Sequence, residues 1–231
     1  FGDPLVGSSK DVTFMVDLSS LFPQGAVADE EEVRSFFLRL PETAQELQTI
    51  ARTLGAPKES VFLREEATEK KVKSMELNHA RIIAFATHGL VSGQRKGLAE
   101  PALVLTTPEV GSLEDDGLLT ASEIAQLKLD ADLVILSACN TASSDGKPGA
   151  EGLSGLARSF FYAGARSLLV SHWPVESESA MKLTTGMFTE LAAQPGIGRA
   201  EALKRAQLSL ILDDNNPRFA HPLFWAPFVV V

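Results

Sequence analysis

Short apolar runs alternate with longer amphipathic segments along most of this chain. Residues 81–86, 133–136 and 167–171 contain nearly continuous apolar runs, as expected of parallel strands that are buried on both faces. The closing residues 227–231 predict a further strand. Apolar residues recur at helical spacing in six segments: 41–54, 67–77, 120–127, 152–162, 177–193 and 199–211. Strands that alternate with helices predict an α/β fold with a mostly parallel sheet covered on both faces.

Capping signals mark where several of these helices begin and end. Pro41 suits a first helical turn, and Thr68 is placed to cap the helix that follows it. Thr120, with Glu123 three residues later, is a capping-box pattern. Gly55 and Gly164 are typical C-terminal stops, and both follow the last apolar position of a helix.

The remaining segments carry weaker signals. Short strands are predicted at 61–63 and 102–105, and the turn residues around 115–117 are compatible with a hairpin. Residues 5–40 are the least regular, with only a weak strand signal over 12–18. Because no repeat, low-complexity tract or linker divides the chain, we interpret residues 1–231 as one domain.

Composition narrows the class of protein. The chain has 231 residues, 45% of them hydrophobic, which is enough for one large α/β domain. Its net charge of −9 disfavours a nucleic-acid partner, and no apolar run is long enough to span a membrane. A single cysteine excludes an internal disulfide and fits a reducing, cytoplasmic setting. Because the chain begins with Phe1, we expect a domain that comes from a longer protein.

The single cysteine and one histidine occupy equivalent places in the pattern. Cys139 comes just after the apolar run 133–136, and His88 comes just after the run that ends at Ala86. Ligands and chemistry collect at the carboxyl ends of strands in open α/β sheets. His88 lies 51 residues upstream of Cys139, and caspases place a catalytic histidine before their cysteine at about that spacing. We therefore predict that the two strands are neighbours in a parallel sheet and that both side chains lie at one edge.

Other interpretations of these residues stay open at this stage. A free cysteine is often only a small buried hydrophobic residue. His172 also follows a predicted strand, at 167–171, and its alternative is a structural histidine beside Trp173. His79 and His221 lie in loop-like contexts. Backbone amides beyond the strand ends could stabilise an oxyanion, and Gly89 lacks the Cβ that would keep a substrate carbonyl away from its amide.

No sequence pattern calls for a metal or another cofactor. The one cysteine and four histidines lack zinc-ligand spacing. The chain contains neither a phosphate-binding loop motif nor the Gly-x-Ser-x-Gly elbow of serine hydrolases. We therefore expect chemistry that needs no cofactor.

Seven motifs spread over nearly the whole chain resemble those of the CHAT domain, a caspase-like and separase-like peptidase domain that usually follows tetratricopeptide (TPR) repeats in bacteria. The matching segments are Phe1–Leu5, Phe85–Gly89, Asp116–Ile124, Leu136–Thr141, Gly152–Arg158, Ser171–Val175 and His221–Phe228. The resemblance implies a caspase-like three-layer α/β sandwich with a mostly parallel central sheet. It also implies a catalytic dyad of His88 and Cys139, and an oxyanion hole formed by the amides of Gly89 and Cys139.

The resemblance further points to substrate-binding residues. In related peptidases the segment after the tryptophan helps to form the S1 pocket, often with an acidic residue. Many CHAT sequences read Trp-Pro-Val-Asp-Asp there, whereas this chain has Glu176 and then Glu178 after Trp173. Those glutamates either pair with a basic P1 residue or favour the first turn of the next helix. Glu151 matches a glutamate common in the family, and either stabilises a helix start or lines the pocket.

Three functions compete. The first is a cysteine endopeptidase that acts on a protein or peptide substrate and is regulated by TPR repeats in the same full-length chain, with no nucleic-acid or membrane partner and no cofactor. The second is a non-catalytic scaffold with the same cleft. The third is a lone redox-sensing thiol. The presence of both His88 and Cys139 favours the first, because a scaffold needs neither.

Overall fold

The computed structural model describes residues 1–6, 39–90, 92, 99–109, 111–112, 115–137, 155–173 and 175–231. Cys139, Glu151 and the weak strand signal at 12–18 therefore lie outside the described residues. The described part confirms the predicted α/β architecture with a mostly parallel sheet.

The larger sheet has the strand order β1-β5-β6-β7. Strands β1 (Ile82–Phe85), β5 (Leu133–Leu136) and β6 (Leu168–Ser171) run parallel, and β7 (Phe228–Val230) pairs antiparallel with β6. All residues of β5 and β6 are buried, as expected of strands covered on both faces. The prediction that the strands preceding His88 and Cys139 are parallel neighbours is confirmed, because β1 pairs directly with β5.

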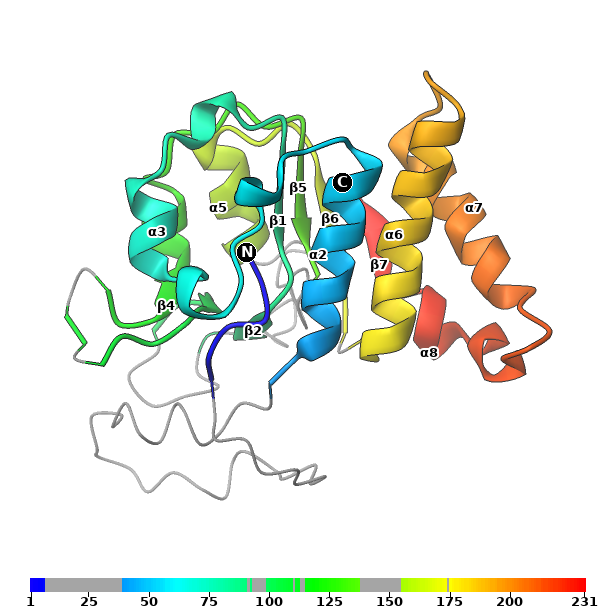
Figure 1. Cartoon of the computed structure of the whole chain (residues 1–231), viewed down its shortest axis with the longest axis horizontal. Coiled ribbons are helices and arrows are strands. Elements are labelled where there is room, and N and C mark those ends of the chain that lie inside the picture. Colours follow the sequence, from blue (N-terminus) through cyan, green and yellow to red (C-terminus); the bar gives the residue numbers. More distant parts are fainter. Residues whose placement is uncertain are drawn as a thin grey trace, which may run out of the picture.

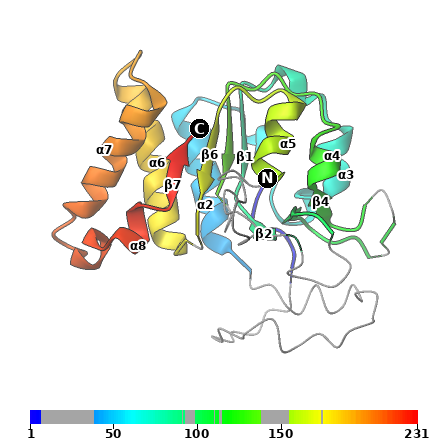
Figure 2. The ribbon, with the colours of Figure 1, turned by 180° about the vertical axis from the view of Figure 1, so that it is seen from behind.

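Two helical layers enclose this sheet (Figures 1 and 2). One layer contains α2 (Pro41–Thr53), α6 (Ser177–Ala193) and α7 (Arg199–Ile211), and the other contains α3 (Glu69–Ser74), α4 (Ala121–Ile124) and α5 (Gly155–Ala163). Alternate residues of β5 point to opposite faces of the sheet, and each face packs into its own hydrophobic core. Leu133 and Ile135 pack on the α2/α6/α7 side, whereas Val134 and Leu136 pack on the α3/α4/α5 side. The short helix α8 (Pro222–Trp225) precedes β7.

A second, antiparallel sheet begins at the predicted catalytic histidine. It has the order β2-β3-β4 and contains β2 (His88–Leu90), β3 (Ala102–Val104) and β4 (Leu118–Thr120). The strand expected at 102–105 is confirmed as β3, which pairs antiparallel with β2 on one side and with β4 on the other. The sequence placed His88 at the end of a strand, and the structure shows that it is also the first residue of β2, where it pairs with Val104. Just before it, the Thr87 hydroxyl donates to the Val104 carbonyl, so the chain enters this sheet at once.

The capping signals are confirmed where the structure describes them. The Thr68 hydroxyl accepts a hydrogen bond from the Lys71 amide at the start of α3, and Thr120 and Glu123 form a capping box at α4. Gly55 and Gly164 adopt positive φ angles of 67° and 113° after α2 and α5. Helices α3 and α4 are shorter than predicted. The backbone becomes extended at Met75 after α3, whereas α4 ends at Ile124 and single turns continue to Leu127, where the Leu127 amide donates to the Ile124 carbonyl.

The first residues of the chain lie against the outer edge of β1. The Phe1 amino group donates to the Ala84 carbonyl at 2.8 Å, and the Ala86 amide donates to the Phe1 carbonyl at 2.9 Å. Gly2 continues the contact through isolated bridges to Leu63 and Ala86, in place of the full strand predicted at 61–63. A Cβ on Gly2 would lie 2.8 Å from the Ala86 carbonyl oxygen, so glycine allows this close approach.

Candidate functional site

A small cavity lies where β1 and β5 end, on the side of the sheet covered by α2 and α6. Its volume is about 80 Å³, and its lining includes His88, Ser137, Glu46, Thr43, Val175 and Ala180. Five separate parts of the described chain therefore meet there: α2, the β1–β2 junction, the end of β5, the segment that leads into α6, and the start of β7. The position agrees with the rule that sites in open α/β sheets form beyond the carboxyl ends of strands.

The pairing of β1 and β5 relates the two predicted dyad residues. Phe85 is the register partner of Leu136, and each is followed three residues later by a dyad residue, His88 or Cys139. Beyond Leu136 the contact continues for one more residue, because the Ser137 amide donates to the Phe85 carbonyl at 2.9 Å. His88 itself is partly exposed and lines the cavity. The prediction that the Cys139 side chain shares this edge stays a prediction.

Sequence reasoning missed the most deeply buried acidic residue of the site. Glu46 on α2 is only 2% exposed. Its carboxyl oxygens accept hydrogen bonds from the Ser137 hydroxyl at 3.2 Å and from the Thr184 hydroxyl of α6 at 2.9 Å. Burial raises the pKa of Glu46 to about 7. A signal was present in the sequence, since Glu46 lies four residues before Ile50 on the apolar face of the predicted helix.

The other histidines lie away from the cavity. His172 is exposed, and its amide donates to the Pro227 carbonyl beside β7. His79 is exposed as well. His221 is exposed and accepts a hydrogen bond from the Leu223 amide through its Nδ1 atom, which caps α8. Of the histidines in the described ranges, His88 is thus the one whose position suits a base at the strand ends.

The predicted substrate-binding glutamates already have partners within the protein. The Glu176 carboxylate accepts a hydrogen bond from the Ser179 amide at 2.9 Å and so caps α6. Glu178 pairs with Arg218 at 2.6 Å, and Arg218 also lies 3.5 Å from Glu176. The Trp173 indole donates to the Leu223 carbonyl at 3.4 Å. These contacts correspond to the second interpretation of the glutamates, in which they favour the first turn of the following helix.

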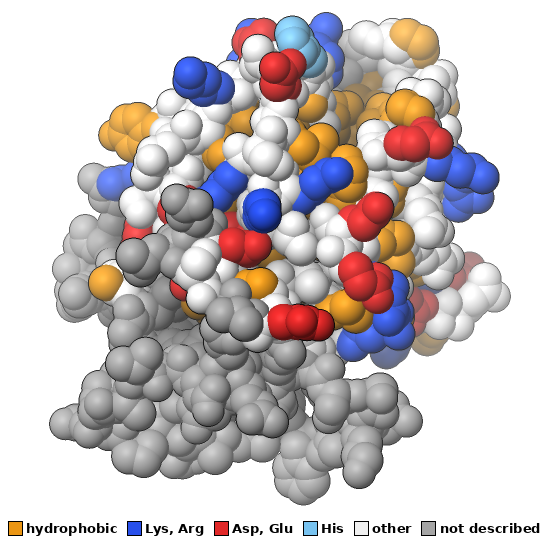
Figure 3. Space-filling view, turned by 60° about the vertical axis from the view of Figure 1, so that its left-hand side comes forward, with side chains coloured by type: hydrophobic (Ala, Val, Ile, Leu, Met, Phe, Trp, Pro, Cys, Tyr) orange, Lys and Arg blue, Asp and Glu red, His pale blue; other side chains and the backbone are white. Residues whose placement is uncertain are grey.

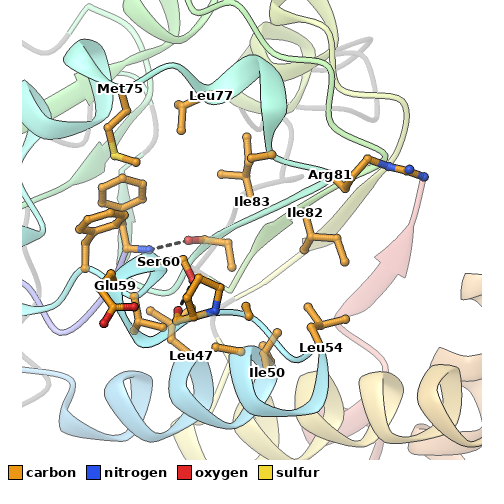
Figure 4. Close-up of a pocket in the computed structure, with 18 of the residues that line it drawn as sticks. Leu47, Ile50, Leu54, Glu59, Ser60, Met75, Leu77, Arg81, Ile82 and Ile83 are labelled. Atoms are coloured by element: carbon orange, nitrogen blue, oxygen red, sulfur yellow. Dashed lines mark hydrogen bonds between the residues drawn. The ribbon is translucent and has the colours of Figure 1, made fainter.

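A larger cavity lies elsewhere, between α2 and the outer edge of β1 (Figure 4). It has a volume of about 760 Å³, and apolar side chains line it from α2, from β1 and from the segment that contains Met75 and Leu77. Its lining includes Phe1 but not His88. The larger cavity is therefore separate from the strand-end site. Figure 3 shows the molecule from another side, where hydrophobic side chains gather between acidic and basic ones.

Among the described residues, no three His, Cys, Asp or Glu side chains come together in a group that could hold a metal ion. None of the helices that the structure describes has the length and apolar character required to cross a membrane.

Comparison with known proteins agrees with this architecture. Residues 8–231 match the CHAT domain family. Two similar curated proteins are tetratricopeptide repeat protein 28 of Mus musculus, 27% identical over 224 residues, and its counterpart of Homo sapiens, 26% identical over 224 residues. Each alignment covers 83% of this chain and 8% of the relative, so the chain spans a small part of the proteins it matches.

Proposed function

Since this chain belongs to the CHAT domain family, which is caspase-like, we propose that it is a cysteine endopeptidase with a Cys139–His88 dyad. One observation carries the proposal. The in-register pairing of Phe85 with Leu136 ends β1 and β5 at the same edge of the sheet, and His88 and Cys139 each follow three residues later in the sequence, which supports the dyad. A nucleophile and its base must come within hydrogen-bond reach, and this register is the arrangement that supports it.

The proposed reaction has two stages. In the first, the Cys139 thiolate attacks the scissile carbonyl carbon, and the His88 imidazolium gives its proton to the departing amine, which leaves an acyl-enzyme and the new amino terminus. In the second, His88 takes a proton from water as the water attacks the thioester. The carboxylic acid product leaves, and Cys139 is regenerated. The amides of Gly89 and Cys139 are the proposed donors to the oxyanion in both stages.

For substrate recognition, the contacts of the glutamates support an apolar wall more than a charged one. Glu176 caps α6, and both Glu176 and Glu178 meet Arg218, so a basic P1 side chain would have to compete with those partners. Trp173, which is partly buried, offers a flat apolar surface for the stem of a P1 side chain. Glu151 remains a proposed pocket or helix-start residue.

The proposed regulation of the peptidase comes from other parts of the full-length protein. The matched relatives are named for tetratricopeptide repeats, and this chain corresponds to only 8% of their length. TPR repeats elsewhere in the full-length chain are therefore the proposed regulatory partner, and a protein or peptide is the proposed substrate. A nucleophile that works as a free thiol is suited to the reducing cytoplasm, which is the proposed location.

The test uses the full-length protein with a thiol-reactive, substrate-like peptide probe and a peptide library. If the protein is an endopeptidase, the probe labels Cys139, this labelling requires His88, and the protein cleaves a defined subset of the peptides. Labelling that is unaffected by His88→Ala, together with no cleavage of any peptide, would contradict the proposal. Reversible oxidation of Cys139 without cleavage would favour a redox-sensing thiol, and tight binding of uncleaved peptides would favour a scaffold.

A further inference from the structure

Glu46 connects three elements that meet at the strand-end cavity. Its carboxyl group lies on α2, accepts a hydrogen bond from Ser137 at the end of β5, and accepts another from Thr184 in the middle of α6. All three residues are buried. Glu46 also lines the cavity that contains His88. The group is thus placed inside the candidate site, yet the proposed reaction assigns it no step.

Ser137 is the link between Glu46 and the proposed nucleophile. It is two residues before Cys139 in the sequence. Its amide is held by the Phe85 carbonyl of β1, and its hydroxyl is held by Glu46. The main chain of Ser137 is therefore fixed from β1 while its side chain is fixed from α2. Any displacement of Ser137 moves the chain that leads directly into Cys139.

We propose that Glu46 is a positioning residue of the site. Its hydrogen bond with Ser137 fixes the start of the segment that leads to Cys139, and its hydrogen bond with Thr184 fixes α6 against α2. The role assigned to Cys139 rests on the proposed function. The contacts of Glu46 do not depend on it. Helix α6 begins directly after the segment that contains Trp173 and Glu176, so the same carboxyl group ties the nucleophile side of the cleft to the proposed substrate side.

The strength of this hold depends on protonation. Burial raises the pKa of Glu46 to about 7. The ionised carboxylate accepts charge-assisted hydrogen bonds from both hydroxyls. In the protonated carboxyl one oxygen carries the proton, so that oxygen becomes a donor and a poorer acceptor. The Thr184 hydroxyl also lies 3.0 Å from the Ala180 carbonyl, which gives its proton another acceptor when Glu46 is protonated. The ionised form therefore holds Ser137 and Thr184 more tightly.

The charged neighbours of Glu46 in the described part of the chain are few. In a chain that begins at Phe1, its amino group acts on Glu46 electrostatically, but burial lowers the pKa of that amine to about 5, so it is neutral where Glu46 titrates. In a longer chain the same nitrogen belongs to an uncharged peptide bond. His88 shares the cavity, and α6 presents the neutral residues Ser177, Ala180 and Thr184. Imidazole and thiol groups also titrate near neutral pH, so the test must compare variants with wild type at each pH.

The experiment measures alkylation of Cys139 by iodoacetamide in the full-length protein from pH 5.5 to 9, with quantification of the Cys139 peptide by mass spectrometry. The variants are Glu46→Gln, Ser137→Ala and their combination. Glu42→Gln is the matched control, because Glu42 is exposed one turn earlier on the same helix. Glu46→Gln has nearly the volume of wild type, and circular dichroism identifies any variant that does not fold. Ser137→Ala keeps the carboxyl group and removes only the link.

The expected result is a pH-dependent ratio of rates. The Glu46→Gln rate divided by the wild-type rate is close to 1 below pH 6 and falls to about one tenth above pH 8, the size of loss that a slightly misplaced group produces. Ser137→Ala gives the same loss above pH 8, the combination adds nothing, and Glu42→Gln has no effect. A ratio that is constant with pH, or an unaffected Ser137→Ala variant, would overturn the positioning role. If the alkylation rates follow the predicted ratios but the protein cleaves no peptide, the positioning role stands and only the peptidase assignment is rejected.

Discussion

Phe85 and Leu136 are direct partners on adjacent parallel strands. Each lies three residues before a predicted dyad residue, His88 or Cys139. The caspase-like sheet thus places two segments that are 51 residues apart in the sequence beside each other at one edge. That relationship leads to the first prediction, which concerns the dyad itself.

His88→Ala and Cys139→Ala are each expected to abolish peptide cleavage while the protein stays folded. Since a nucleophile and its base act as one unit, the double variant should be hardly slower than either single variant. The measurement is kcat/KM on a peptide selected from the library. His172→Ala is the matched control and should keep wild-type turnover, because His172 is an exposed imidazole just after β6. Wild-type turnover by Cys139→Ala would contradict the peptidase assignment.

Glu176→Gln is expected to lower kcat/KM by the same factor for peptides with Arg and with Leu at P1. The Glu176 carboxylate caps α6, so its replacement should loosen the loop that contains Trp173. It should not remove a group that recognises the charge of the P1 side chain. The weaker cap should cost about 0.5–1 kcal/mol of stability. Urea unfolding and kinetics on the matched peptide pair check both effects. A loss confined to the Arg peptide would restore the hypothesis that Glu176 reads a basic P1 residue.

The free energy of unfolding should depend on Glu46 in a defined pH window. The pKa of Glu46 rises on folding from 4.5 to about 7, so the folded state binds this proton more tightly than the unfolded state. The corresponding stability is fully present below pH 4.5 and is lost as the pH rises to 7, with a magnitude on the order of 3 kcal/mol.

Urea unfolding of wild type and Glu46→Gln at pH 5 and pH 8 checks this expectation. The stability difference between the two proteins should change by most of that amount in favour of the variant at the higher pH, and Glu42→Gln should show no such change. In a chain that begins at Phe1, the buried amine titrates in both proteins, so the comparison cancels its opposite contribution. A difference that does not vary between the two pH values would show that Glu46 titrates normally.

Gly164→Ala should destabilise the fold much more than Gly196→Ala. Both glycines have positive φ angles, 113° and 96°. A Cβ on Gly164 would collide with the Leu129 carbonyl oxygen, whereas a Cβ on Gly196 has no neighbour within 4 Å. We expect a loss of roughly 1 kcal/mol at Gly196, from backbone strain alone, and about 3 kcal/mol at Gly164. Equal losses in thermal unfolding would mean that the turn after α5 relaxes to accept the side chain.

The sequence by itself determined the features that depend on neighbours along the chain. Apolar spacing predicted α2, α6 and α7 closely, and Thr68, Thr120 and Gly164 marked helix ends that the structure confirms. Continuous apolar runs predicted β1, β5 and β6 and their parallel packing. These signals succeed because capping bonds, helical faces and buried strands are set by residues a few positions apart.

Only the tertiary structure decided which polar groups meet at the strand ends. Glu46 finds Ser137 and Thr184 at separations of 91 and 138 residues, so no local pattern could reveal the network. His88 joins a second sheet because Val104 lies opposite it, and the Glu178 carboxylate is paired with Arg218, which is 40 residues away in the sequence. A hydrogen-bond partner is chosen by distance in space, and burial then fixes the charge of the group, so the chemistry of the site emerges only when the chain is folded.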